Sequence, residues 1–193
     1  MSYSRLPAFV LGFHGCDRAV AELVVSRRGH LKPSENEYDW LGHGVYFWEN
    51  NPARAMSWAM AHAERAREKG NAFEPAVVGA IIDMGKCLDM LNAASIDLVE
   101  QAYAHLKRIH EKDGTPLPSN ENLPGSSDYL LRKLDCAVIN FLHGAADEPF
   151  DSVRAAFLEG EPIYQNAGFR RKNHVQICVR NVQNIKGYFH PFD

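Results

Sequence analysis

The sequence lacks any run of the roughly 20 apolar residues that a membrane-spanning helix requires. Its first residues, MSYSRLPAFVLG, also lack the basic stretch followed by a long apolar core that marks a secretory signal peptide. These two absences favour a protein that is made and kept inside the cell. We therefore expect it to be cytoplasmic and to have no membrane partner.

Paired cysteines and strong net charge are missing as well. Cys16, Cys87, Cys136 and Cys178 are widely spaced and form no C-x-x-C pair, which argues against a zinc knuckle or a disulfide scaffold. We expect them to be reduced, buried thiols. The net charge of −3 and the pI near 6.3 argue against nonspecific attraction to nucleic acid or anionic lipid, although they leave room for a local basic patch.

The composition is that of a globular domain with a mixture of strands and helices. With 193 residues, 46% of them hydrophobic and 23% charged, the chain suits one domain with an ample core. Apolar patterning predicts strands at 8–16, 76–84, 153–158, 175–180 and 185–189, and helices at 18–26, 52–69, 95–112 and 127–144. The expected first residues or caps of these helices are Asp17, Asn51, Ser95 and Ser127. We expect residues 113–127 to form a loop and Met56, Ala59, Met60 and Ala63 to face the core.

The most informative stretch is DWLGHGVYFWENNPARAMSWA, residues 39–59. Gly42 and Gly44 permit close backbone approach, and four aromatic residues crowd the same short segment: Trp40, Tyr46, Phe47 and Trp48. Aromatic side chains beside permissive glycines are suited to gripping a flat ring. The alternative is an ordinary strand that packs its aromatic residues into the core.

Two further segments carry residues suited to a ligand site. His14 and Gly15 end the first predicted strand, where an imidazole and bare backbone are both within reach of a ligand; a purely structural histidine is the alternative. In the late strand HVQICVR, alternation places Val175, Ile177 and Val179 on one face and His174, Gln176 and Cys178 on the other. The first of these faces builds the core, and the second is free to face a site.

Taken in order, F-H-G at residues 13–15, G-H-G-V-Y-F at residues 42–47 and the late strand resemble the ADP-ribosyltransferase superfamily of the diphtheria-toxin and poly(ADP-ribose) polymerase type. The resemblance implies an α+β fold with a split β-sheet and flanking helices over residues 1–193. It implies that NAD is the substrate, that His14 binds the adenosine ribose, that the Gly15 backbone pairs with the carboxamide and that Tyr46 stacks on nicotinamide. It also places further residues at the NAD site: Gly44, Phe47, Ser57, Trp58 and His174, with Ser57 or Trp58 closing the second face of the ring.

The third position of the family signature departs from the pattern, because the late strand carries no glutamate. We expect Gln176 to take this position, with His174 as the second candidate; Glu159 and Glu161 are alternative sources of the missing carboxylate. Without the glutamate, the resemblance favours transfer of a single ADP-ribose unit over chain polymerisation. The acceptor is a protein or nucleic acid, and the basic cluster at residues 170–172 hints at a phosphorylated or nucleic-acid acceptor, unless it is only a solvated loop.

Other functions stay open on the sequence alone. A protein of the same fold can hydrolyse NAD, bind NAD without catalysis, or transfer 2′-phosphates from RNA ends, although the sequence shows no arginine beside His14 or Tyr46 for that last reaction. A metallohydrolase using His14, His43, Asp39 and His174 is a further alternative, but no H-E-x-x-H spacing supports it. A toxin-like effector checked by a separately encoded inhibitor protein is a hypothesis for the biological role.

Overall fold

A largely antiparallel sheet forms the centre of the molecule. The computed structural model describes residues 9–122 and 129–191. The sheet contains seven strands in the order β4-β7-β8-β2-β1-β3-β9, and only the β4–β7 pair is parallel. Its members are β1 (Phe9–Asp17), β2 (Val45–Glu49), β3 (Pro75–Asp83), β4 (Cys87–Asp89), β7 (Ser152–Phe157), β8 (His174–Val179) and β9 (Ile185–Phe189). The expected mixture of strands and helices in a single domain is confirmed.

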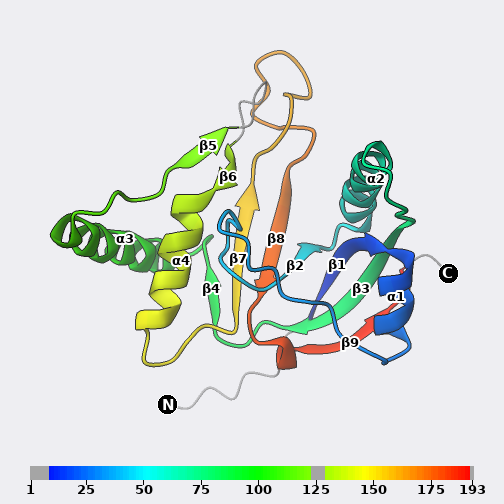
Figure 1. Cartoon of the computed structure of the whole chain (residues 1–193), viewed down its shortest axis with the longest axis horizontal. Helices are drawn as coiled ribbons and strands as arrows, with labels where there is room; N and C mark the ends of the chain where they lie inside the picture. The colour runs from blue at the N-terminus through cyan, green and yellow to red at the C-terminus, as the bar shows by residue number, and fades with distance from the viewer. Residues whose placement is uncertain (1–8, 123–128, 192–193) are drawn as a thin grey trace.

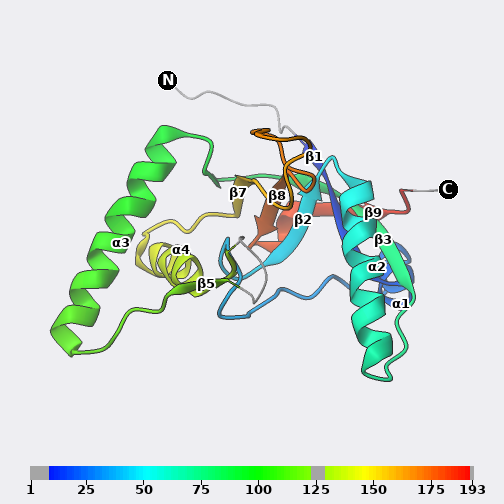
Figure 2. The same cartoon turned by 90° about the horizontal axis from the view of Figure 1, so that it is seen from above.

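Four helices of the described chain cover the two faces of this sheet. They are α1 (Arg18–Val25), α2 (Pro52–Glu68), α3 (Ala93–Asp113) and α4 (Lys133–Ala145), with a separate two-stranded ribbon of β5 (Asn120–Asn122) and β6 (Tyr129–Arg132). Figure 1 shows α1 beside β3 and β9, and α4 beside β7 and β4. Seen from above, α2 and α3 lie at opposite ends of the molecule (Figure 2). None of the helices in these two described ranges is both long and apolar enough to cross a bilayer.

The two faces of the sheet have different surroundings. On the first face, Val45, Phe47, Ile177 and Val179 form one core cluster with α1, through Ala21 and Val24. On the second face, Cys178 and Phe157 pack with Ile139 of α4, while Phe13 and Trp48 pack with Ala55 of α2. The second face is thus covered by α4 at one end and α2 at the other, and the stretch between them holds the candidate site.

Most predicted elements are confirmed within one or two residues. The side chain of Asp17 caps α1 by accepting a hydrogen bond from Ala19 N, and Asn51 caps α2 by accepting one from Arg54 N. The thiols of Cys16, Cys136 and Cys178 are free and buried, as expected, and Cys87 is free and half-buried. Met60 corrects our assignment of the buried side of α2, since it is 53% exposed and the buried positions are Ala55 and Ala59.

The middle of the chain differs most from the sequence prediction. Helix α3 begins at Ala93 and is capped by Asn92, not opened by Ser95. Residues 129–132, which we expected to be helical, form strand β6 and pair with β5, so α4 begins only at Lys133. The predicted helix start at Ser127 lies outside the described residues. Strands β4 and β5 have too few residues to give an apolar pattern and were not predicted.

Candidate functional site

The sheet opens between β1 and β2. All nine residues of β1 pair with β3, whereas only Gly12 and Phe13 pair with β2. The oxygen of Leu11 accepts a hydrogen bond from Asn50 N at 2.9 Å, so Leu11 turns its backbone groups towards β2. Because these directions alternate along an antiparallel strand, the N–H and C=O of Gly15 also face the β2 side, beyond the end of the ladder.

His14 stands at the start of this opening. Its Nδ1 lies 2.7 Å from the main-chain oxygen of Tyr46, where a backbone partner would sit in a continuous ladder. A carbonyl oxygen only accepts, so Nδ1 carries the proton and Nε2 is left as an acceptor. Burial lowers the pKa of His14, which keeps the ring neutral. The imidazole also meets the Phe47 ring edge-on at 5.9 Å between centroids.

The predicted catalytic residues meet only in part. The register pairs Tyr46 with Cys178 and Trp48 with Gln176, so these side chains share the second face of the sheet. The imidazole of His14 lies with Phe47 on the first face and reaches Tyr46 through its main chain. The phenol of Tyr46 donates to Gly42 O at 2.8 Å and accepts from Leu41 N at 2.9 Å, which fixes the loop before β2. Burial raises the pKa of Tyr46, so the phenol stays neutral.

Buried polar atoms without partners gather on the second face. Each of the following is inaccessible to solvent and has no hydrogen-bond partner among the described residues: Trp48 Nε1, Arg54 Nε, His174 Nε2 and Gln176 Oε1. The ring centroids of Trp48 and His174 are 6.4 Å apart, and the Arg54 guanidinium lies 5.7 Å from the Trp48 ring. Such unpartnered groups are costly in a folded protein, and each calls for an explanation. A ligand that supplies the missing hydrogen-bond partners is one. Two of the four atoms are donors and two are acceptors.

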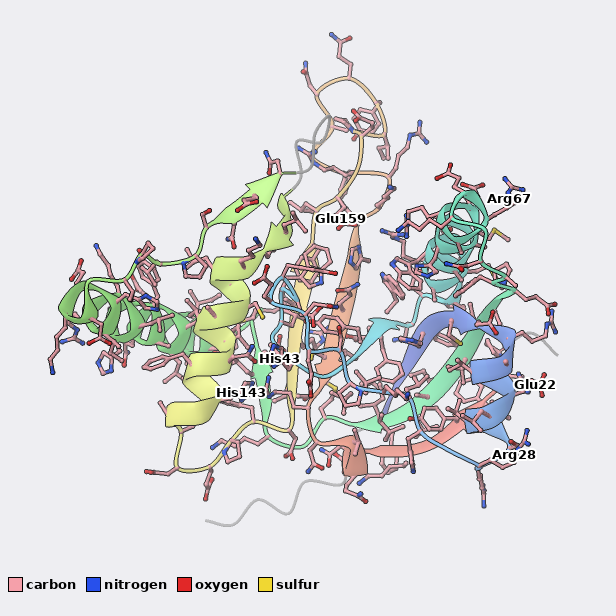
Figure 3. The ribbon with its side chains drawn as sticks, in the orientation of Figure 1. Glu22, Arg28, His43, Arg67, His143 and Glu159 are labelled. Atoms are coloured by element: carbon pink, nitrogen blue, oxygen red, sulfur yellow. The ribbon has the colours of Figure 1, made fainter. Side chains whose placement is uncertain are left out.

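An ion pair closes one side of this group. Arg54, on the first turn of α2, donates from Nη2 to Glu159 Oε2 at 3.0 Å, and both side chains are largely buried. The same carboxylate oxygen lies 3.8 Å from Nδ1 of His174. His174 Nδ1 donates to Lys172 O at 2.6 Å, and burial lowers the pKa of His174, so its Nε2 is again a bare acceptor. Figure 3 labels Glu159, which lies just beyond the end of β7.

Helix α2 closes the opening from the other side. A Cβ on Gly15 would collide with the main-chain oxygen of Ala55 and would lie 3.2 Å from the Trp58 ring, so only glycine permits this approach. Trp58 in turn lies 6.1 Å from Trp48 between centroids. Ser57, the alternative second face for a bound ring, is exposed and donates to Ala53 O of its own helix. Of the two residues, Trp58 is the one that lies against Gly15.

Two of the residues predicted to contact NAD have structural roles. Phe47 is completely buried in the core of the first face, so its side chain is not available to a ligand and supports His14 instead. Gly44 pairs with Ser34, and a Cβ there would lie 2.6 Å from the sulfur of Cys178. The glycine is required for packing of β2 against β8. The alternation along β2 explains the position of Phe47, because the side chains of Tyr46 and Phe47 cannot face the same side of a strand.

Sequence reasoning missed several residues of the site. Arg54 has no distinguishing signal within its helix. Trp40, which the sequence does mark as one of four aromatic residues, stacks on Phe157 at 4.2 Å between ring centroids, and both rings lie beside His174. Arg132 lies over both of these rings, 4.9 Å from Trp40 and 5.2 Å from Phe157. Glu159 had been one of two alternatives; Glu161, the other, is exposed.

Metal binding finds no support in the described ranges. No group of three or more His, Cys, Asp or Glu side chains among residues 9–122 and 129–191 is arranged to hold an ion. Asp39 instead accepts a hydrogen bond from Asn36 N, and the main chain of His43 is held by Asn140 and Arg180. Two surface hollows, of about 470 and 250 Å³, lie elsewhere: beside the end of α2 at Arg67 and Phe73, and between His43 and α4.

Comparison with known proteins adds one relative. No family model matches the chain, and no solved structure matches it. The chain is similar to "Uncharacterized protein MJ0359" of Methanocaldococcus jannaschii, with 25% identity over 210 residues that cover 96% of this chain and 87% of the relative. The similarity extends along almost the whole chain but brings no activity with it.

Proposed function

We propose that the protein is an NAD-dependent mono-ADP-ribosyltransferase with an ADP-ribosyltransferase-like split sheet. NAD would lie across the opening between β1 and β2 and on the second face of the sheet. The acceptor would be a macromolecule, and nicotinamide would be released. The opening itself supports this fold, because β1 leaves β2 directly after Phe13, where the family motif places its histidine and glycine.

One observation carries the proposal: the four orphaned polar atoms of Trp48, Arg54, His174 and Gln176. A ribose hydroxyl both donates and accepts, so it can serve the His174 and Gln176 acceptors and the Trp48 donor. The pyrophosphate of a dinucleotide accepts only, which matches the free Nε–H of Arg54. A ligand that brings hydroxyls and an anion on one scaffold would satisfy the whole set once side-chain movement exposes these buried atoms.

The nicotinamide and adenosine ends also find suitable groups. The Gly15 amide faces the opening, where it can pair with a carboxamide, and the proposed ring contacts are Trp58, which lies beside Gly15, and Tyr46. The bare Nε2 of His14 can accept from a hydroxyl of the adenosine ribose. His14 and Gly15 thus act on opposite faces of the sheet, which is feasible because the ladder between β1 and β2 has ended.

The protein contributes to this reaction mainly by electrostatic stabilisation and not by covalent catalysis. The bond between the ribose C1 and the nicotinamide nitrogen breaks, its electron pair leaves with nicotinamide, and the pyridinium becomes neutral. The acceptor nucleophile bonds to C1 and loses its proton. Cationic character develops on the ribose in between, so a nearby carboxylate lowers the barrier. Glu159 is the buried carboxylate beside His174, and it would take the role of the glutamate that β8 lacks.

NAD hydrolysis is the second candidate function. It would use His174 as the base for an attacking water, because burial keeps the ring neutral with Nε2 bare, while Nδ1 lies 3.8 Å from Glu159 Oε2. The RNA 2′-phosphate reaction gains an arginine that the sequence did not reveal, Arg54, but that reaction is expected to use several arginines. We therefore rank hydrolysis ahead of phosphate transfer.

Incubation with isotope-labelled NAD and cell extract tests the proposal. Released nicotinamide and label retained on macromolecules are measured for the wild type, for Tyr46→Ala and for Gln176→Ala. We expect both variants to lower nicotinamide release by about 100-fold, the usual effect of losing a transition-state contact. Nicotinamide release without retained label would identify a hydrolase. Tight NAD binding without release over hours would identify a binding module, and absence of both binding and release would refute the proposal.

A further inference from the structure

The segment between β7 and β8, residues 158–173, which we name the β7–β8 loop, exposes apolar side chains to an unusual degree. Among the large hydrophobic residues of the described chain, the three most exposed are Leu158 at 66%, Phe169 at 64% and Tyr164 at 61%. All three belong to this loop. Single exposed hydrophobic residues need no explanation, but a concentration of them on one projecting segment marks an interaction surface.

The loop has a fixed shape that presents these side chains. Main-chain hydrogen bonds join Lys172 N to Glu159 O at 3.0 Å, Arg171 N to Glu161 O at 2.9 Å and Ile163 N to Phe169 O at 3.1 Å. Pro162 and Arg170 form an antiparallel bridge in the same frame. Figure 1 shows the loop projecting beyond the ends of β7 and β8. The rings of Tyr164 and Phe169 are thus held in solvent by a hairpin-like frame and not by a collapsed coil.

Positive charge lies beside the aromatic rings. Arg171 and Lys172 are exposed and form no ion pair with another described residue, and Arg170 adds a third cation. Glu161 is the exposed acid of the loop, since Glu159 is buried against Arg54. The chain as a whole carries a net charge of −3, whereas this loop carries an excess of positive charge.

The base of the loop belongs to the candidate site. The main-chain oxygen of Lys172 holds Nδ1 of His174, and Glu159 begins the frame described above. A polymer lying along the loop would therefore reach the centre at which NAD is proposed to react. Exposed rings next to the exposed cations Arg171 and Lys172 suit single-stranded nucleic acid, whose bases are free to stack while its phosphates meet the cations.

We propose that the β7–β8 loop binds single-stranded nucleic acid, with bases stacked on Tyr164 and Phe169 and phosphates at Arg171 and Lys172. Its use as the ADP-ribose acceptor rests on the proposed function, but the binding does not. A paired duplex is a poor ligand for this loop, because its bases are already stacked. A protein acceptor of acidic character is the competing partner.

Fluorescence anisotropy without NAD tests the binding directly. The probes are labelled single-stranded DNA and RNA of about 16 nucleotides, the corresponding duplexes and a labelled acidic peptide, in about 50 to 200 mM salt. The variants are Tyr164→Ala/Phe169→Ala and Arg171→Ala/Lys172→Ala. The matched controls are Leu91→Ala, which removes an exposed apolar side chain at 58% exposure, and Lys69→Ala, which removes an exposed charge after α2.

We expect the wild type to bind single strands at least tenfold more tightly than duplexes. The aromatic double variant should lose about tenfold or more in affinity, the charge variant should lose affinity together with part of the salt dependence, and both controls should bind like the wild type. Equal binding of duplexes, equal losses in the controls, or binding of the acidic peptide alone would overturn the inference. Label transfer from NAD is measured separately, so its absence with intact binding refutes the proposed function and leaves the binding surface standing.

Discussion

The imidazole of His14 hydrogen-bonds the main-chain oxygen of Tyr46 at 2.7 Å, across the point where β1 and β2 part. This contact fixes the tautomer of His14 and joins the two halves of the opening. His14→Gln keeps an N–H donor for that oxygen but replaces the Nε2 acceptor of the rigid imidazole with the oxygen of a flexible amide. We predict a fall of about 100-fold in nicotinamide release with little change in fold. His105→Gln, an exposed position on α3, is the control, and equal activity of the two variants would remove His14 from the site.

Gly15 tests the close approach of α2. Gly15→Ala would push a methyl group into Ala55 O and the Trp58 ring, so we expect a loss of about 1–3 kcal/mol in the free energy of unfolding and weaker NAD binding. Gly144→Ala in α4 is the control, because a Cβ there meets nothing within 4 Å. That change should stabilise by roughly 0.5–1 kcal/mol. Urea denaturation measures both, and equal stabilisation of both variants would contradict the packing described.

Substitutions in the Arg54–Glu159 pair distinguish the effect of charge on activity from the effect of burial on stability. Glu159→Gln retains an acceptor for Arg54 but removes the charge, so nicotinamide release should fall by about 100-fold while NAD affinity changes less. Arg54→Leu alone leaves a buried carboxylate unpaired and should destabilise by about 3–5 kcal/mol. Arg54→Leu with Glu159→Leu should recover most of that loss. Activity of the Glu159→Gln variant equal to that of the wild type would show that the carboxylate takes no part.

The sequence predicts features that depend on contacts between near neighbours. The wrong predictions concern contacts between residues that are far apart along the chain. Asp17 and Asn51 cap their helices by contacts within three residues, and alternation alone places His174 with Gln176. The start of α4 is different, because its first N–H groups are capped from another strand. Asn120 Oδ1 accepts from Leu134 N and Asp135 N, while residues 129–132 pair with β5. No local signal at Ser127 describes that contact.

The candidate site follows the same division. The His14–Gly15 pair and Trp58 lie in short motifs that the sequence makes visible. Arg54 and Glu159 are 105 residues apart along the chain, and only the fold of β7 beside β8 and of α2 over β1 brings them together. Neither residue type nor spacing identifies such a pair, which is why the carboxylate stayed open between Glu159 and Glu161 until the structure placed the first inside and the second outside.

His143 gives the stability a predictable pH dependence. Both of its ring nitrogens are buried without a partner among the described residues, and burial lowers the pKa of His143 to about 4. Between pH 6.5 and 4 the unfolded chain takes up a proton that the folded one does not, so stability falls as the pH falls. The loss reaches about 3 kcal/mol for this group. His14 and His174, whose pKa values are also lowered, add slope of the same sign.

His143→Leu should therefore flatten the curve without abolishing it. Urea denaturation at pH 7.5 and at pH 5 measures the free energy of unfolding at both ends. The variant should lose less stability on acidification than the wild type, and His105→Leu, at an exposed position, should lose as much as the wild type. An unchanged slope in His143→Leu would mean that the imidazole is protonated inside the folded protein.

At Gln176, stability and the proposed function make opposite demands on the side chain. Its Oε1 is buried and unpartnered, and such a group costs about 1–3 kcal/mol in a folded protein. Gln176→Leu removes the amide at similar volume, so we expect the free energy of unfolding to rise by about 1 kcal/mol while nicotinamide release falls. A given NAD concentration should stabilise the wild type more than the variant, because the variant lacks one of the two acceptors, His174 and Gln176, that face the ribose. A variant that is less stable than the wild type would show that the amide is satisfied without a ligand, and the central support for NAD binding on this face of the sheet would be lost.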